Sequence, residues 1–183
     1  MKKIAFILAL AFLGQICVHA QPFKKGDKVL NLGIGIGTGI YSGGAYSMRI
    51  PPVAASFEVG VSDKLGIGYI GAGGVLGIAG SKYEVTILDT YGWKYTYIIV
   101  GGRAAYHFDL VDDLDIYAGL MAGVSITTSK EIGDPPIGEN PESTGYAHYE
   151  FAGIRYYVSS GFALMAELGY GVSYLRLGVA FKF

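Results

Sequence analysis

Residues Tyr174 to Phe183 read YLRLGVAFKF, and this stretch decides the fold. Apolar side chains recur there at every second position: Leu175, Leu177, Val179, Phe181 and Phe183. Small or charged residues fill most of the positions between them. A repeat of two places the apolar set on one face of a β-strand and the other set on the opposite face. The pattern predicts a terminal strand whose two faces meet different surroundings, one apolar and one polar.

The amino terminus predicts export. Two lysines follow Met1, an uninterrupted apolar run covers Ile4 to Leu13, and Ala20 is a small residue suited to signal-peptidase cleavage. An apolar run of this length is too short to cross about 30 Å of hydrocarbon. We therefore expect a cleaved signal peptide over residues 1–20 and one mature domain over residues 21–183. An exported chain with such a closing strand is typical of an outer-membrane β-barrel, with apolar side chains facing lipid.

Eight segments of the mature chain show alternation, although the faces of the third are ambiguous because it is rich in glycine. The chain is 51% hydrophobic and only 16% charged, and its apolar residues are distributed over all eight segments rather than concentrated in one. The fold class expected is all-β, an eight-stranded antiparallel up-and-down transmembrane β-barrel. The predicted strands are Lys28–Ile40, Val53–Val61, Gly66–Gly77, Lys94–Phe108, Leu114–Thr127, Tyr146–Val158, Phe162–Tyr170 and Tyr174–Phe183.

The connections between these segments alternate in length. Those after the second, fourth and sixth segments are short, whereas residues 41–52, 78–93 and 128–145 form long ones. Bacterial barrels have short periplasmic turns and long extracellular loops, so both termini should be periplasmic. Aromatic residues near the strand ends predict two interfacial girdles. The girdle members expected are Phe108, Tyr156, Phe162, Phe181 and Phe183 at the periplasmic end, and Tyr41, Tyr91, Trp93, Tyr146 and Tyr170 at the other.

Four stretches carry a resemblance to a known family: KKGDKVLNLGIG from Lys24, GIRYY from Gly153, AELGYG from Ala166, and the stretch from Leu175 to the end. With these motifs the chain resembles the small outer-membrane β-barrel domain proteins of Bacteroidetes-type bacteria. The resemblance implies an eight-stranded barrel related in architecture to the OmpA/OmpX type, without a peptidoglycan-binding domain. It specifies the barrel rather than an activity.

Five charged residues fall on the strand face opposite the apolar one: Glu58, Arg103, Arg155, Glu167 and Arg176. An arginine facing lipid near the midplane would cost about 2–4 kcal/mol, so these residues should face the lumen. There they are expected to form a structural ion network, each arginine offering a planar fork of donors. Because an eight-stranded barrel is just wide enough for side chains, we expect the network to plug the lumen.

The expected role is structural or surface-interacting, and three alternatives stay open. A lipid hydrolase or acyltransferase would use His148 and Glu150 with Ser173 or Ser125. A narrow gated pore would use the lumen charges, and a soluble lipocalin-like carrier would need an apolar interior. The GIGYIG run at Gly66 matches a dinucleotide fingerprint, but no helix pattern follows it, so neither a cofactor nor a metal site is expected.

The partners expected follow from this assignment. They are outer-membrane lipids, the barrel-assembly machinery and an extracellular ligand. The assembly machinery would recognise Phe181 and Phe183 as an assembly signal in the closing strand. The extracellular ligand would bind through the three long connections, residues 41–52, 78–93 and 128–145. No basic run suggests nucleic acid, and the chain is expected to be a monomer.

Overall fold

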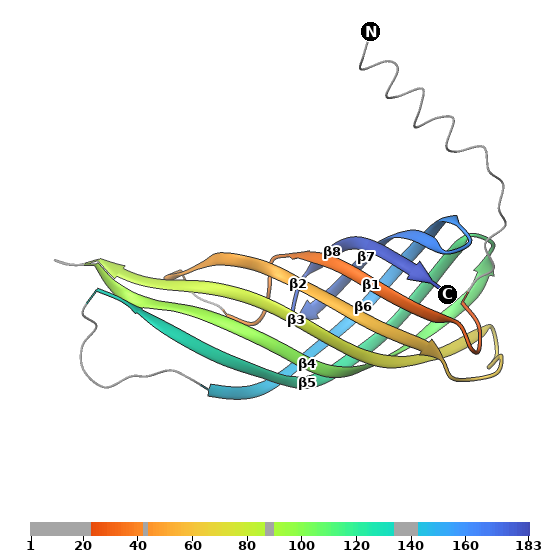
Figure 1. Cartoon of the computed structure of the whole chain (residues 1–183), viewed down its shortest axis with the longest axis horizontal. Helices are drawn as coiled ribbons and strands as arrows, with labels where there is room; N and C mark the ends of the chain where they lie inside the picture. Colours follow the sequence, from red (N-terminus) through yellow and green to blue (C-terminus); the bar gives the residue numbers. More distant parts are fainter. Residues whose placement is uncertain (1–22, 42–43, 87–89, 134–142) are drawn as a thin grey trace, which may run out of the picture.

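The computed structural model describes residues 23–41, 44–86, 90–133 and 143–183, so the predicted signal peptide lies outside the described residues. Within these ranges eight antiparallel strands each pair with their sequence neighbours, and β1 pairs with β8 to close a barrel (Figure 1). This confirms the predicted fold class. No helix among the described residues is long and apolar enough to cross a bilayer. The strands are β1 Lys28–Ile36, β2 Tyr46–Gly60, β3 Gly68–Thr86, β4 Thr90–Val111, β5 Leu114–Ile132, β6 Ser143–Ser159, β7 Phe162–Gly171 and β8 Leu175–Lys182.

The barrel is apolar on the outside. In β1, Val29 and Asn31 are buried inside, whereas Leu32 and Ile34 are 41% and 56% exposed. The same alternation runs through all eight strands, because successive side chains of a strand point to opposite faces. The exposed apolar side chains that form this belt include Leu32, Ile34, Val53, Phe57, Leu76, Ile78, Ile98, Val100, Leu120, Val124, Ile126, Ile154, Val158, Leu164, Leu168, Leu177 and Phe181.

The third strand, whose faces the sequence left ambiguous, follows the same rule. Val75 is buried inside the barrel, and Leu76 and Ile78 lie outside. At Gly73 a Cβ atom would lie 1.8 Å from the carbonyl oxygen of Phe57, so this position of β3 accepts no side chain. Close approach of β2 to β3 therefore accounts for the glycine at this position.

The three long connections are shorter than predicted, and this part of the prediction was wrong. β3 and β4 pair without interruption from Gly68 with Phe108 to Thr86 with Thr90. Most of the segment 78–93 is therefore strand, and parts of 41–52 and 128–145 belong to β2, β5 and β6. The prediction stopped where apolar alternation stopped. Threonine and tyrosine continue the ladder beyond that point, since they fit a pleated sheet whether or not one face is apolar.

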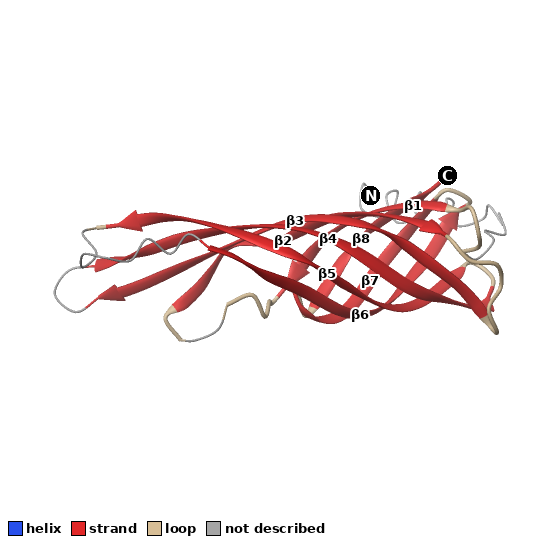
Figure 2. Ribbon diagram, turned by 90° about the horizontal axis from the view of Figure 1, so that it is seen from below, coloured by secondary structure: helices blue, strands red, loops and turns tan. Residues whose placement is uncertain are grey.

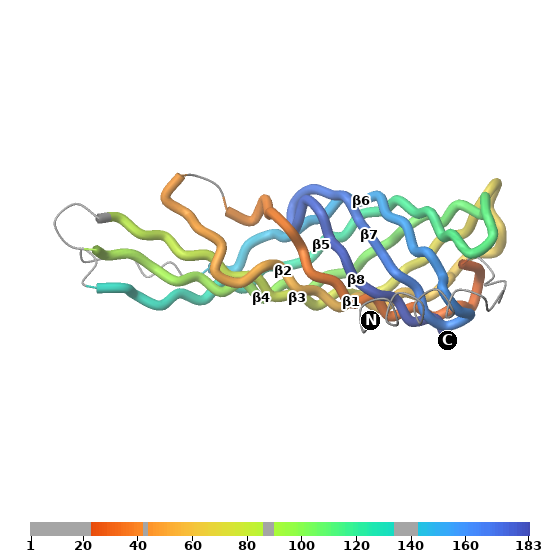
Figure 3. Tube along the Cα trace, turned by 90° about the horizontal axis from the view of Figure 1, so that it is seen from above, coloured from red at the N-terminus to blue at the C-terminus, as the bar shows by residue number. Residues whose placement is uncertain are grey.

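The longer strands build a sheet that extends past the closed barrel. β3, β4 and β5 contain 19, 22 and 19 residues, whereas β7 and β8 contain 10 and 8. Figures 2 and 3 show the ends of β3, β4 and β5 projecting well beyond β1, β7 and β8. β1 ends at Ile36 rather than at the predicted Ile40, because Gly37 takes a positive φ of 69° that breaks the extended backbone.

Most of the described girdle residues lie outside the barrel near its two ends. Tyr156 and Phe183 are 54% and 68% exposed near one end, and Tyr146 and Tyr170 are 73% and 60% exposed near the other. Trp93 contradicts its assignment, because only 9% of it is exposed. It lies an even number of residues from Arg103 in β4, so it faces the inner side of the sheet and contacts Tyr83.

Candidate functional site

The lumen contains all five charged residues that the sequence placed there. Glu58 comes from β2, Arg103 from β4, Arg155 from β6, Glu167 from β7 and Arg176 from β8. Their exposed fractions range from 0% to 4%. Strand alternation positions each of them, because the flanking residues of every strand face outward.

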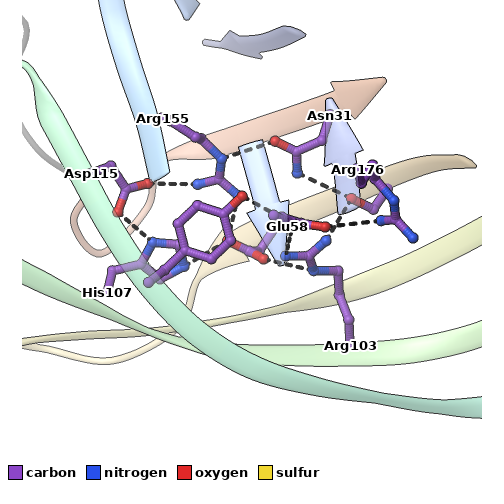
Figure 4. Close-up of polar contacts among 10 residues, drawn as sticks. Asn31, Glu58, Arg103, His107, Asp115, Arg155 and Arg176 are labelled. Atoms are coloured by element: carbon purple, nitrogen blue, oxygen red, sulfur yellow. Dashed lines mark hydrogen bonds and ion pairs between the residues drawn. The ribbon is translucent and has the colours of Figure 1, made fainter. Parts of the chain in front are cut away.

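The five residues form a connected ion network (Figure 4). Arg103 Nη2 donates to Glu167 Oε1 at 3.1 Å, and Arg176 Nη1 donates to Glu167 Oε2 at 3.1 Å. Arg155 Nη2 donates to Glu58 Oε1 at 3.4 Å. Arg103 Nε lies 3.0 Å from Glu58 Oε2, an ion pair without hydrogen-bond alignment. Each carboxylate thus joins two arginines from different strands.

Two further titratable residues extend the network. Asp115, at the start of β5, accepts a hydrogen bond from Arg155 Nη1 through Oδ2 at 2.6 Å. His107, in β4, lies between two carboxylates, with Nδ1 2.8 Å from Asp115 Oδ1 and Nε2 2.7 Å from Glu58 Oε1. The five network residues predicted from the sequence include neither His107 nor Asp115. Alternation would have found both, since His107 shares a strand face with Arg103, and Asp115 follows the outward-facing Leu114.

Uncharged groups satisfy other donors and acceptors in the network. Arg155 Nε donates to Asn31 Oδ1 at 2.9 Å, and Asn31 Nδ2 donates to Ser56 Oγ at 3.1 Å. Ser56 Oγ also accepts from Arg103 Nη1 at 3.0 Å, and the Tyr117 hydroxyl donates to Glu167 Oε1 at 2.9 Å. Buried charges require such additional hydrogen bonds to offset their lost hydration.

Aromatic rings pack against the guanidinium groups. The Cζ atoms of Arg103 and Arg155 lie 4.3 Å from the ring centres of Phe151 and Tyr117, respectively. Arg176 Cζ lies 4.6 Å from the ring centre of Tyr149. A cation over an aromatic face is attracted by the ring quadrupole, and more strongly where water is excluded. The rings therefore fix the planes in which the arginines present their donors.

Apolar layers border the network on both sides. The Phe23 ring stacks on His107 with centroids 3.8 Å apart, on the side of the lumen where Val29 and Tyr157 are also buried. The opposite layer contains Ile99 and Met121. The additional members of the two layers are Ala163 and Ala180 beside Phe23, and Ala54, Val75, Ala105, Tyr117, Ala147, Tyr149, Phe151 and Val172 in the other.

Glycines in the wall make room for the network. A Cβ at Gly71 would lie 2.9 Å from Glu58 Oε1, and one at Gly153 would lie 2.8 Å from Glu167 Cγ. A Cβ at Gly33 would lie 2.8 Å from Arg176 Cδ. Gly71 belongs to the run that matches the dinucleotide fingerprint, and its position against Glu58 accounts for the glycine there.

The charges in the network nearly balance. Three arginines face the three carboxylates of Glu58, Asp115 and Glu167, with His107 as a seventh titratable group. His107 Nδ1 is within hydrogen-bond geometry of Asp115 Oδ1, and because a carboxylate oxygen only accepts, Nδ1 is the donor. His107 Nε2 is close to Glu58 Oε1 without hydrogen-bond alignment. No group of three side chains able to hold a metal ion occurs in the described ranges. The arrangement cross-links six strands, β2, β4, β5, β6, β7 and β8, through contacts between charged side chains.

The structure brings the residues of the enzyme alternative together only in part: His148 and Ser125 line one cavity, but neither Ser125 nor Ser173 forms a hydrogen bond with His148. His148 Nδ1 and Glu150 Oε1 are 2.9 Å apart, on the face of β6 opposite the buried Ala147 and Tyr149. Ser173 is fully buried in the turn between β7 and β8. Ser125 lines a cavity of about 410 Å³ at the outer mouth of the lumen, together with Tyr95, Tyr97 and other residues. The second expected site, the carboxy-terminal aromatic pair, lies outside the barrel, with Phe181 against Phe162 and Phe183 near Phe57.

Comparison with known proteins gives structural similarity only. No family model and no curated protein matches the chain. The crystal structure of Ail, the attachment invasion locus protein of Yersinia pestis, is 11% identical over 87% of this chain and 99% of that chain, with a TM-score of 0.47. A second crystal structure of Ail, in complex with the heparin analogue sucrose octasulfate, is also 11% identical over 87% and 99%, with a TM-score of 0.46. The N-terminal β-barrel domain of Pseudomonas aeruginosa OprF is 17% identical over 87% and 98%, with a TM-score of 0.43.

Proposed function

We propose that the chain is an integral outer-membrane β-barrel of a Gram-negative bacterium with a structural or surface-interaction role, and that its ion network plugs the lumen. One observation carries the proposal: the barrel is apolar outside and charged inside. Leu120 and Leu168 are 60% and 66% exposed on the outer face, while Glu58, Arg155 and Glu167 are fully buried. In water this arrangement would expose the apolar surface and bury the charges, whereas lipid outside the barrel favours both placements.

The same observation disfavours the three alternatives. A lipocalin-like carrier needs an apolar chamber, but here charged and hydrogen-bonding side chains occupy the lumen. A hydrolase needs a nucleophile within hydrogen-bond reach of its base. Neither Ser125 nor Ser173 forms a hydrogen bond with His148, although Ser125 and His148 line one cavity. A gated pore needs a path through the lumen, and the arginine–carboxylate contacts of 2.6–3.4 Å cross it.

Orientation and assembly belong to the same proposal. Lys28 N donates to the Phe183 carbonyl at 3.2 Å, so the beginning of β1 and the end of the chain meet at the barrel end that also holds the short turns after β2, β4 and β6. We assign this end to the periplasm, where Phe181 and Phe183 would be read by the assembly machinery. The extended ends of β3, β4 and β5, with their connections, are then extracellular and available to a ligand.

The proposal is tested by fractionating cells to locate the protein and by comparing two substitutions to arginine on the same strand. We expect the mature protein in the outer-membrane fraction and heat-modifiable migration in gels. Leu120→Arg, in the apolar belt, should lower stability by about 2–4 kcal/mol or block insertion. Thr128→Arg, on the same face of the same strand but beyond the belt, should be tolerated. Recovery as a soluble periplasmic protein, with both variants behaving as wild type, would contradict the proposal.

A further inference from the structure

Three lysines form one row across the extended sheet, a placement that rests on the barrel proposed above. Lys82 in β3 pairs in register with Lys94 in β4, and Lys94 pairs in register with Lys130 in β5. Residues directly opposite each other on antiparallel strands have Cβ atoms about 4.5–5.5 Å apart, and like charges there are destabilising. A row of three equal charges therefore needs a compensating anion.

The lysines lie on the outer face of the sheet. Ser81, the neighbour of Lys82, is fully buried on the inner side, where its hydroxyl lies 2.9 Å from that of Tyr97. Lys94 lies an even number of residues from the outward-facing Ile98, as Lys130 does from Ile126. All three ammonium groups are thus presented on the surface that continues the apolar belt.

A fixed arginine joins this row, and we name the four residues Arg49, Lys82, Lys94 and Lys130 the basic cluster. Arg49 Nη2 donates to the Tyr95 carbonyl at 3.1 Å and to Thr96 Oγ1 at 2.6 Å. One carboxylate offsets part of the charge, since Glu84 Oε1 lies 2.5 Å from Lys82 Nζ. Glu131 follows Lys130 and so points to the opposite face. Among the described residues, Glu84 is the carboxylate paired with the basic cluster, and its single negative charge leaves a net charge of +3 over the four basic side chains.

The position of the basic cluster relative to the belt identifies its partner. The outermost full row of the belt on these strands is Ile78, Ile98 and Ile126, which pair in register. The lysine row lies four residues further along each strand, about 13 Å at the usual rise. An amphiphile with its acyl chains on the isoleucines would place its headgroup at the lysines.

We infer that the basic cluster binds the phosphate groups of a phosphorylated glycolipid in the outer leaflet, whose acyl chains pack on the isoleucine row below. Lysine binds phosphate as a point charge, and Arg49 retains donors for a phosphate oxygen. Basic residues near a membrane surface attract anionic lipid, each with an effect that falls off within a Debye length. The phosphates supply the anion that the in-register lysines require.

The test uses the refolded mature protein in phosphatidylcholine nanodiscs, with diphosphoryl lipid A as the probe. We compare binding of diphosphoryl lipid A, of lipid A with both phosphates removed, and of inorganic phosphate. The variant Lys94→Gln/Lys130→Gln removes two charges from the basic cluster. The control Lys24→Gln/Lys28→Gln removes two charges at the opposite end of the chain's barrel. At about one kcal/mol per basic residue, the first variant should bind the diphosphoryl probe about thirtyfold more weakly.

The expected result is preference for diphosphoryl lipid A, lost in the Lys94/Lys130 variant and kept in the control. Equal binding of the dephosphorylated lipid, or equal losses in both variants, would overturn the inference. Saturable competition by inorganic phosphate at the same concentration would make the cluster a free-anion site and reject the lipid as its partner. Failure to insert into nanodiscs at all would instead contradict the barrel proposal, so the two failures are distinguishable.

Discussion

At the scale of single residues, Glu167 shows how one buried carboxylate joins several strands. It accepts hydrogen bonds from Arg103, Arg176 and Tyr117, all inside the lumen. Alternation in the sequence predicted its inward placement, and it limited the arginine partners to three. It did not choose between them, because that choice depends on the register of the strands and on which strands face each other across the lumen. The pairing of Glu167 with Arg176 follows from the register of β7 with β8.

Glu167→Ala should lower the free energy of unfolding by about 3–5 kcal/mol, because it leaves arginines buried without a counter-charge. Adding Arg176→Met should recover part of the loss, because the arginine left without a counter-charge is then removed. Comparison of the double variant with the two single variants gives the interaction free energy between Glu167 and Arg176. Urea unfolding in detergent micelles measures both effects. Glu150→Ala is the matched control, because Glu150 is exposed outside the lumen and should change stability by less than about 1 kcal/mol. Unchanged stability of Glu167→Ala would place its side chain in water.

At the scale of elements, alternation predicted eight strands and the faces of all but the third, but it misjudged where the longer strands end. β5 shows why. From Leu114 to Ile126 its outward residues are mostly apolar, and the contrast with the inner face makes the period of two visible. From Thr127 to Ile132 the strand carries mainly polar residues on both faces. Its pairing with β4 continues there, although the sequence pattern that would reveal a strand has disappeared.

β6 offers a comparison of two glycines in one strand. A Cβ at Gly153 would lie 2.7 Å from Tyr117 Cζ and 2.8 Å from Glu167 Cγ, whereas at Gly145 no atom lies within 4 Å. Gly153→Ala should therefore destabilise the barrel by about 1–3 kcal/mol through overpacking. Gly145→Ala should change stability by no more than about 0.5 kcal/mol. Heat-modifiability curves of both variants measure the difference. Equal midpoints would mean that the network yields freely to an added methyl group.

The connections of β5 test the orientation. A protease site inserted between residues 133 and 143, after β5, should be cleaved on intact cells. The same site inserted in the two-residue turn before β5, at Asp112 and Asp113, should be cleaved only after the outer membrane is permeabilised. Western blotting of the fragments gives the result. Cleavage of only the second site on intact cells would invert the proposed barrel.

At the scale of the whole molecule, the ion network and its apolar layers lie across the lumen, and the proposed function makes them a plug. We expect no discrete conductance when the wild-type protein is reconstituted into planar bilayers. The reason is that six strands contribute charged or histidine side chains to one cross-section, and Phe23 packs beneath them. A general porin in the same bilayers is the positive control for detection. A stable wild-type channel would contradict the plug and favour the gated-pore alternative.

The hydrogen bond between Arg155 and Asn31 joins positions 124 residues apart in the chain. Contacts of such high contact order form late in folding, because long loops must close before they can form. Until β1 meets β8, Arg155 lacks the acceptor that β1 supplies, and an unclosed sheet would carry incompletely paired arginines into hydrocarbon. The lumen charges thus penalise every partly assembled intermediate more than the finished barrel. With the membrane location proposed above, we expect insertion and ring closure to occur as a single cooperative event.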